Sequence, residues 1–395
     1  MTLRLNKRPT TLVGVGAIAA LLLAGCGGGS ETEAALDSAP VAPAASGAAS
    51  SGDGALAAQY KGTLREPDGS SRPIAKGKKV AILSAGQASI SSSVPVAAAE
   101  AAAKAAGWTP VVYDVQLNPA NAPGLVRQAI AAGVDGIILQ AVDCPGAKGP
   151  LQEARAKGIE IVGIYSFDCN DPVFNATSEP PLFTGRVNYG PQITDYGPFT
   201  ESYGADQAKA VIEATGGKAK IIFFNSPSVT VLNYTGRGFK KEIEKCAECE
   251  IVAEIEFAGS ELSPNLQQKA TTALLQNPDA NVVKSPYTSA TLLGIAPAVV
   301  QSGRASKMYV MGGEGFEPEL NLLRAGQGVN AVNIAPSDWT GWAAVDTLSS
   351  LFNDTPVMDS GLGWQLVDKG HNLPKSGPFV PPVDFKAIYK KAWGV

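Results

Sequence analysis

The chain has 395 residues, of which 45% are apolar and 17% are charged, with 43 glycines and 28 prolines. This composition supports about two or three folded domains and excludes a globally disordered chain. The formal net charge is −4, and no Lys/Arg-rich block stands out that could neutralise a nucleic-acid backbone, so we expect no nucleic-acid partner. The single histidine, His371, argues against most metal sites and histidine-based catalysis.

The first 25 residues have the pattern of a secretory signal. Basic residues precede a short apolar run from Thr11 to Leu23, which is below the roughly 18–20 residues needed to span a bilayer. The run closes with Leu23-Ala24-Gly25-Cys26, which resembles a bacterial lipobox, where the chain is cut before the cysteine and the thiol is lipidated. We therefore expect a signal peptide over residues 1–25 and a lipid on Cys26 that anchors the protein at the extracytoplasmic face of the cell membrane.

Residues 26–76 are rich in Gly, Ser, Ala and Pro and show no apolar period of 2 or 3.6 residues. The segment is predicted to be a disordered linker.

From Lys78 onward, short Val/Ile-rich runs alternate with Ala-rich amphipathic stretches. Gly107, Gly133 and Gly158 end three predicted helices at spacings of 26 and 25 residues, which is a βα period. The predicted strands are 79–84, 110–115, 136–141 and 160–165, and the predicted helices are 94–106, 122–132 and 147–157. Four parallel strands with right-handed crossovers form one Rossmann-like half.

A second series follows Asn188. Its predicted strands are 219–225, 250–257, 280–284 and 307–312, and its predicted helices are 195–215, 233–245, 264–276 and 289–302. A further strand at 329–334 and a helix at 338–352 come next, and the chain ends in an amphipathic stretch at 383–393.

In an exported chain, five cysteines suggest one lipidated residue and two disulfides. Cys144 and Cys169 follow two strands that would be neighbours in a parallel sheet, so their loops can meet at disulfide distance. Closing this loop would contribute roughly 3 kcal/mol. Cys246 and Cys249 follow a helix and lie among glutamates, which oppose a reactive thiolate, and no second ligand pair exists for zinc. We predict a second, structural disulfide here and no metal.

Four short segments resemble the type I periplasmic binding proteins, in the ribose-binding-protein-like branch that serves sugar ABC importers. They are Val80-Ala81-Ile82-Leu83, Ala132-Gly133-Val134-Asp135-Gly136-Ile137-Ile138, Gly236-Arg237-Gly238-Phe239 and Gly312-Gly313-Glu314-Gly315. The resemblance covers about residues 78–350. It implies an α/β fold of two doubly wound, Rossmann-like lobes with parallel sheets, joined by a three-segment hinge near Tyr189, Glu314 and residues 355–363.

The resemblance also assigns the lobes. The N-terminal lobe would comprise residues 77–189 and 315–355, the C-terminal lobe residues 190–314 and 356–382, and a C-terminal helix residues 383–395.

In such a fold the ligand lies in the cleft where the carboxyl ends of the strands of both lobes meet. The loops at those strand ends supply the candidate ligand-binding residues, of which Tyr165 and Glu314 are the strongest. They are Gln87, Ser89, Ser91, Asp143, Tyr165, Phe167, Asp168, Asn233, Tyr234, Thr235, Tyr287, Thr288, Glu314, Asn333 and Trp339. Each could instead be a loop or core residue, and Asp143 and Asp168 could merely cap helices.

The family's sugar binders usually carry an Asp-Arg pair after the fourth strand and an Arg before the second-lobe Gly-x-Gly-Phe. Here Tyr165-Ser166 and Thr235 stand in those places, so the resemblance does not extend to ribose or a similar pentose. A less cationic, more aromatic site favours a polyol, a modified sugar or a small aromatic compound.

We therefore interpret the chain as a non-enzymatic, monomeric lipoprotein that captures a solute without a cofactor and delivers it to an ABC permease and its ATPase. The alternatives are uptake of a small aromatic compound, a solute-sensing surface lipoprotein, and an extracellular hydrolase built on Asp143 and Asp168.

Overall fold

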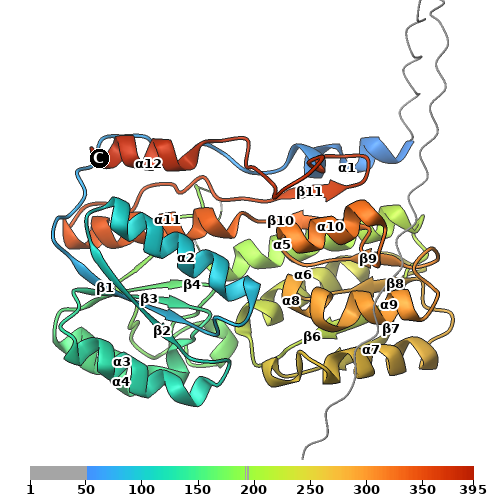
Figure 1. Ribbon diagram of the computed structural model, residues 1–395, viewed down its shortest axis with the longest axis horizontal. Helices are drawn as coiled ribbons and strands as arrows, with labels where there is room; N and C mark the ends of the chain where they lie inside the picture. The colour runs from blue at the N-terminus through green and yellow to red at the C-terminus, as the bar shows by residue number, and fades with distance from the viewer. Residues whose placement is uncertain (1–50, 192, 194) are drawn as a thin grey trace, which may run out of the picture. The chain divides into compact units, whose positions relative to one another are not determined.

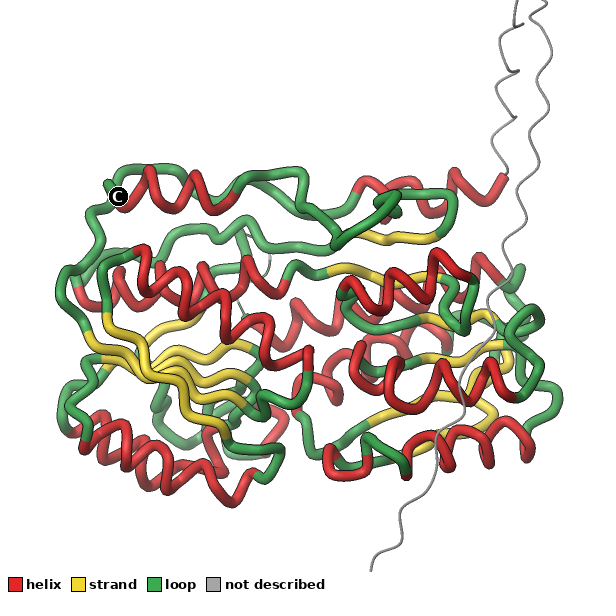
Figure 2. Tube along the Cα trace, viewed as in Figure 1, coloured by secondary structure: helices red, strands yellow, loops and turns green. Residues whose placement is uncertain are grey.

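The computed structural model describes residues 51–395 except 192 and 194. The predicted signal peptide, Cys26 and the first part of the predicted linker lie outside these residues. The described chain folds into two α/β lobes, each a sheet with helices on both faces (Figures 1 and 2). This confirms the predicted fold class.

The first lobe contains a parallel sheet with the strand order β2-β1-β3-β4-β5. Its strands are β1 Lys79–Ser84, β2 Thr109–Asp114, β3 Gly136–Gln140, β4 Glu160–Ile164 and β5 Gly185–Arg186. The central strands are runs of Val, Ile and Leu because both of their faces are covered. Helices α2 Ile90–Ala105 and α11 Ser337–Phe352 cover one face, and α3 Ala122–Ala131 and α4 Cys144–Ala156 cover the other.

The second lobe contains a sheet with the order β11-β10-β9-β8-β6-β7, in which only β11 is antiparallel to its neighbour. Its strands are β6 Lys220–Asn225, β7 Glu250–Glu256, β8 Val282–Lys284, β9 Tyr309–Met311, β10 Ala331–Ile334 and β11 Gln365–Asp368. Helices α5 Tyr196–Ala214 and α6 Thr230–Ile243 cover one face. The other face is covered by α7 Asn265–Gln276, α8 Thr288–Ala290, a π-helical turn Thr291–Ile295, α9 Ala296–Gln301 and α10 Glu317–Ala325.

The prediction that residues 315–355 return to the first lobe is wrong for their first half. Strand β10 pairs with β9 and β11 in the second sheet, because α10 is a short right-handed crossover that brings the chain back beside the strand it left. Only α11 packs on the first lobe. The chain therefore crosses at Ala335 and Pro336, between β10 and α11, and not at Glu314.

The predicted linker is also wrong from residue 51 onward. Residues Ser51–Lys61 form helix α1, and Leu56 is buried in the core of the second lobe. The following stretch pairs with the crossing segment 359–364, where the Thr63 amide donates to the Trp364 carbonyl at 2.8 Å and the Arg65 amide to the Gly361 carbonyl at 2.9 Å. Backbone hydrogen bonds hold this segment in place, and amino-acid composition does not predict such bonds.

The C-terminal stretch forms helix α12 Phe385–Trp393, which packs on α11. Trp342 stacks on Trp393 with ring centroids 5.4 Å apart, and Trp339 stacks on Phe385 at 4.7 Å. In Figure 1, α12 lies above the first lobe and α1 lies above the second.

Helices α5 and α6 approach each other closely at two glycines. A Cβ atom on Gly204 would lie 2.0 Å from the Thr235 carbonyl oxygen, and one on Gly238 would lie 1.9 Å from the Glu201 carbonyl oxygen. Since both obstacles are backbone atoms, a side chain at either position would force the helices apart.

We expect Gly238→Ala to lower the free energy of unfolding by roughly 1–3 kcal/mol, the usual cost of overpacking, as measured by urea denaturation. Gly124→Ala is the matched control, because a Cβ there meets nothing within 4 Å on helix α3 and should add about 0.5–1 kcal/mol. Equal stability of the two variants would contradict the need for close contact.

Candidate functional site

A cavity of about 80 Å³ lies between the two lobes, several times the roughly 10–15 Å³ that one water molecule requires. Both lobes contribute to it. So do the three segments that cross between the lobes, which are the loop between β5 and α5 that carries Tyr189, the segment at Ala335 and Pro336, and the segment 359–364. The lining residues are Tyr165, Tyr189, Tyr196, Phe199, Thr200, Tyr203, Val231, Leu232, Thr235, Pro286, Glu314, Ala335, Ser337, Thr340, Leu362 and Gly363.

Aromatic side chains form much of the cavity wall. The ring of Tyr196 lies 5.3 Å from that of Tyr189 and 5.9 Å from that of Tyr165, and the ring of Tyr189 lies 4.4 Å from that of Phe199. Burial raises the pKa of Tyr165 to about 12 and those of Tyr189, Tyr196 and Tyr203 well above their usual value. The four phenols are therefore neutral at physiological pH.

Tyr165 directly follows β4 and has a left-handed backbone, with φ +56°. A non-glycine residue in this conformation ends the strand sharply. The Tyr165 hydroxyl donates to Thr340 Oγ1 on helix α11 at 3.3 Å, which fixes the ring against the cavity.

Glu314 is the one charged residue among those that line the cavity. Its Oε2 atom accepts the Thr288 amide at 2.6 Å and the Ser91 hydroxyl at 3.3 Å. Its pKa is raised, first because burial disfavours the carboxylate and also because the second carboxylate, that of Glu319, lies nearby.

The loop that carries Glu314 is held by Glu319. The Glu319 carboxylate accepts the Gly313 amide at 2.7 Å, the Gly315 amide at 3.0 Å and the Thr288 hydroxyl at 2.5 Å. Glu319 is fully buried, so these bonds replace its lost hydration. Glu319 thus positions Glu314.

Lys284 is a second buried charge in this part of the second lobe. Its Nζ atom donates to the Ser285 carbonyl at 2.8 Å. Burial lowers its pKa to about 7, although Glu314 and Glu319 favour the charged form. Lys284 itself does not line the cavity.

The lobes also touch directly, so the cleft is closed around the cavity. Ser89 and Ser289 face each other with their hydroxyl oxygens 2.9 Å apart, and the Thr230 hydroxyl donates to the Asp143 carboxylate at 2.5 Å. A further contact stacks Phe167 of the first lobe on Tyr234 of the second at 4.8 Å. The Tyr234 hydroxyl also bonds to Asp171.

The predicted site residues fall into three groups. Tyr165, Thr235 and Glu314 line the cavity. Ser89, Ser91, Asp143, Phe167 and Tyr234 make contacts between the lobes. Gln87, Asp168, Asn233, Tyr287, Thr288, Asn333 and Trp339 do not line the cavity.

The third group has local roles. Gln87 donates to Ser84, and Asn233 donates to the Pro227 carbonyl. Tyr287 packs near Phe257. Thr288 supports Glu314, and Asn333 and Trp339 are buried at 1% and 0% exposure. Trp339 belongs to the core under α12, so its predicted ligand contact is wrong.

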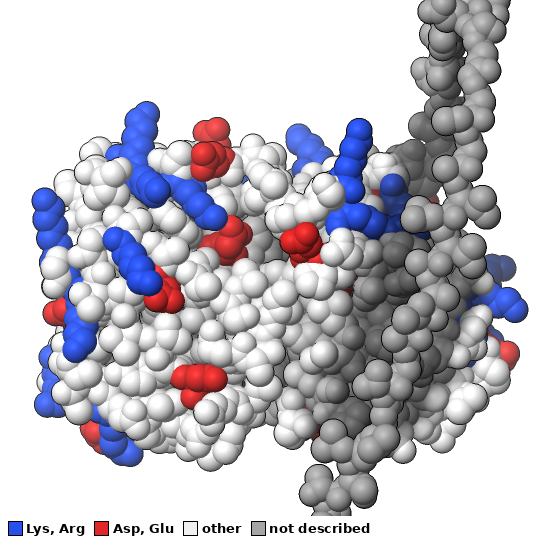
Figure 3. Space-filling view, viewed as in Figure 1, with Lys and Arg blue, Asp and Glu red and all other residues white. Residues whose placement is uncertain are grey.

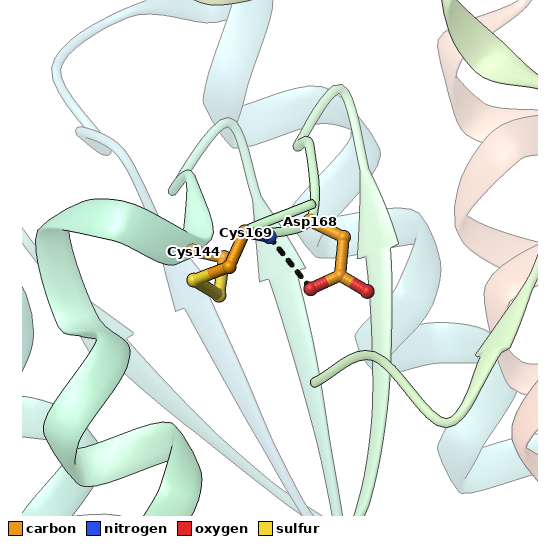
Figure 4. Close-up of side chains that lie close together, drawn as sticks. All are labelled: Cys144, Asp168 and Cys169. Atoms are coloured by element: carbon orange, nitrogen blue, oxygen red, sulfur yellow. Dashed lines mark hydrogen bonds between the residues drawn. A yellow bond between two sulfur atoms is a disulfide. The ribbon is translucent and has the colours of Figure 1, made fainter. Parts of the chain in front are cut away.

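The structure joins Cys144 to Cys169 and Cys246 to Cys249, as the sequence predicts. Figure 4 shows the first disulfide beside Asp168. These three side chains are close enough to share a metal ion, but the sulfur atoms are bonded to each other and cannot act as thiolate ligands. The Asp168 carboxylate accepts the amides of Cys169, Leu182 and Phe183 instead, so it holds a loop.

The same geometry argues against a hydrolase. Asp143 is engaged by Thr230 and by the Phe167 amide, and Asp168 by backbone amides. Neither lines the interlobe cavity, whereas a glycosidase needs its two carboxyl groups on opposite sides of one substrate bond.

Sequence reasoning missed the part of the wall that helix α5 provides. Tyr196, Phe199, Thr200 and Tyr203 line the cavity at positions i, i+3, i+4 and i+7 of that helix. This spacing is a readable signal for one helix face. The strand-end rule does not select these residues, because the helix starts just after a crossing segment and not at a strand end.

Comparisons with known proteins agree with this architecture. A family model described as a periplasmic binding protein domain matches residues 92–355. No curated protein matches the sequence. None of the described helices is long and apolar enough to cross a membrane.

Several solved structures share the fold. An ABC sugar transporter subunit from Rhodobacter sphaeroides is 20% identical, with 75% of this chain and 99% of that chain covered and a TM-score of 0.61. A periplasmic solute-binding protein from Actinobacillus succinogenes with bound D-allose is 21% identical, with 74% and 98% covered and a TM-score of 0.61. One from Mycobacterium smegmatis with bound glycerol is 20% identical, with 77% and 99% covered and a TM-score of 0.61.

Asp143 makes closure sensitive to pH. Burial raises its pKa to about 6, although the bonds from Thr230 and Phe167 partly oppose this rise. The structure thus binds a proton more tightly than a solvated aspartate, and the resulting stability is complete below about pH 4 and is lost as the pH rises through about 6.

We expect the melting temperature of the wild type to fall relative to that of Asp143→Asn between pH 4 and pH 7. The asparagine oxygen can still accept the Phe167 amide and its NH2 group can donate to the Thr230 hydroxyl, so both contacts persist without the charge. Differential scanning fluorimetry across this range measures the difference. Asp279→Asn, at a carboxylate 84% exposed, is the control and should track the wild type. A constant difference between wild type and Asp143→Asn would contradict the assignment.

Proposed function

We propose that this chain, which belongs to the periplasmic binding protein domain family, captures a small solute in its interlobe cavity and delivers it to an ABC importer. The family places the domain outside the cytoplasm. The observation that carries the proposal is a cavity lined by both lobes and closed by direct bonds between them.

Such a cavity supports capture by closure. A ligand that contacts Tyr165 of the first lobe and Glu314 of the second gains both sets of contacts only when the lobes are together. It therefore shifts the equilibrium toward the closed form in proportion to its extra affinity for that form. The closed surface is what a permease would recognise.

We assign the solute to the sugars, polyols and related compounds. Related folds were solved with D-allose, glycerol and, in a protein from Thermotoga lettingae, 5-methylthioribose. In this chain the hydroxyls of Thr200, Thr235 and Ser337 line the cavity beside the aromatic rings. Hydroxyls and a carboxylate can bond to sugar hydroxyls, while the rings cover C–H faces.

The aromatic wall also favours a second candidate, uptake of a small aromatic compound, because five aromatic side chains line one cavity. In a solute-sensing role the same ligand would bind in the same cavity. The closed form would then be recognised by a receptor and not by a permease.

We further propose that Cys26 carries the lipid anchor, since the sequence before it resembles a lipobox. The protein would then act as a monomer at the extracytoplasmic face of the membrane. The uncovered part of the face in Figure 3 carries both basic and acidic side chains, which suits a small-molecule carrier better than a nucleic-acid binder.

The test is a thermal-shift screen of neutral sugars, polyols, aromatic compounds and their amine-bearing counterparts. A ligand at 100 times its dissociation constant should add about 2.7 kcal/mol of stability, and small-angle scattering should show a smaller radius of gyration with it bound. An unchanged radius with the tightest compound, or recovery of that compound chemically altered, would overturn the proposal.

We expect Tyr196→Ala to weaken binding of the tightest compound at least about tenfold, by loss of ring contact. Tyr309→Ala is the matched control, because Tyr309 is the first residue of β9, at the amino end of the strand, and does not line the cavity. It should leave the affinity within about twofold. Isothermal titration calorimetry compares the two, and an equal loss in both variants would remove Tyr196 from the site.

A further inference from the structure

We propose that the solute is a small hydroxylated organic cation, such as an amino alcohol or an amino sugar, with its ammonium group held between Glu314 and the faces of the tyrosine rings. This inference rests on the proposed function and names the charge of the ligand. It follows from the charge balance of the cavity, the nature of its walls and the hydroxyls around them.

The Glu314 carboxylate accepts hydrogen bonds from the Thr288 amide and the Ser91 hydroxyl and forms no salt bridge within the described chain. The buried Lys284 acts on it only through its charge, because the Lys284 Nζ atom is bonded to the Ser285 carbonyl. An ionised carboxylate shielded from water is costly unless it is paired. A cation in the cavity would supply the missing pair.

The aromatic side chains that line the cavity also favour a cationic ligand. The faces of aromatic rings attract ammonium groups, most strongly where water is excluded, and four tyrosines and a phenylalanine line this cavity. Two of the tyrosine hydroxyls are already engaged, since Tyr165 donates to Thr340 and Tyr203 donates to the Asn333 carbonyl at 2.6 Å. Those two residues therefore offer the ligand mainly their rings.

An anionic solute lacks a partner. No arginine or lysine lines the cavity as the structure describes it, so a carboxylate or phosphate would find no bidentate donor. Lys284 does not change this, because its Nζ atom is bonded to the Ser285 carbonyl and its pKa near 7 makes its neutral form accessible. Thr200, Thr235 and Ser337 also line the cavity. Their hydroxyls donate to backbone carbonyls, so they are available to the hydroxyl groups of the ligand as acceptors.

Two matched pairs of probes separate the effect of ligand charge on affinity from the effect of ligand shape. Choline is compared with 3,3-dimethyl-1-butanol, which has the same shape without charge, and D-glucosamine with D-glucose. Calorimetry at pH 7.5 gives the dissociation constants with the wild type, with Glu314→Gln and with Glu317→Gln. The last variant neutralises an exposed glutamate at the start of helix α10, directly after the loop that carries Glu314.

We expect at least one cation to bind the wild type at least tenfold more tightly than its neutral partner. Glu314→Gln should remove this advantage and leave the neutral partner within threefold, while Glu317→Gln should preserve it. Circular dichroism and melting of each variant separate lost binding from lost folding.

The inference is overturned if neutral partners bind as tightly as cations in both pairs, or if Glu314→Gln keeps the advantage. It is also overturned, with solute capture intact, if the tightest compound of the wider screen is uncharged and indifferent to Glu314→Gln. If no compound of that screen binds or closes the lobes, the proposed function itself fails.

Discussion

The direction of the parallel strands decides where this protein can bind anything. In each lobe the loops at the carboxyl ends of the strands face the other lobe, and from them come Tyr165, Asp143 and Ser89 on one side and Glu314 and Thr230 on the other. Because both sheets obey the same rule, polar and aromatic groups meet in one cleft, although the chain crosses between the lobes three times.

The two kinds of contact in that cleft have different tasks. Bonds such as Ser89 to Ser289 and Thr230 to Asp143 join the lobes directly, so they stabilise the closed form in addition to any contacts with a ligand. Glu314 and the tyrosine rings stabilise the closed form further when a ligand makes contact with them. The choice of ligand therefore depends on the residues that line the cavity. The stability of the closed form depends also on the interlobe bonds around it, and pH acts on those bonds through Asp143.

The sequence predicted the sheets, most helices and both cysteine pairs because each depends on local periodicity or on neighbouring strands. It identified Tyr165, Thr235 and Glu314, which follow the strand-end rule or a family motif. It placed Tyr189 and Leu362 in the hinge but did not predict that they line the cavity, since the path of the crossing segments depends on packing. It also misplaced β10, because a strand at the boundary between lobes can pair with either sheet and periodicity is the same in both.

The N-terminal segment adds a constraint that composition could not reveal. Helix α1 packs on the second lobe, Ala75 is buried in the first, and the chain between them is bonded to residues 359–364 of the hinge. Arg65 also binds Asp359 and the Tyr189 carbonyl, so it joins two crossing segments. This stretch is in effect a fourth connection between the lobes. Rotation of one lobe against the other must therefore bend this segment together with the three crossing segments, or break the bonds that join it to them.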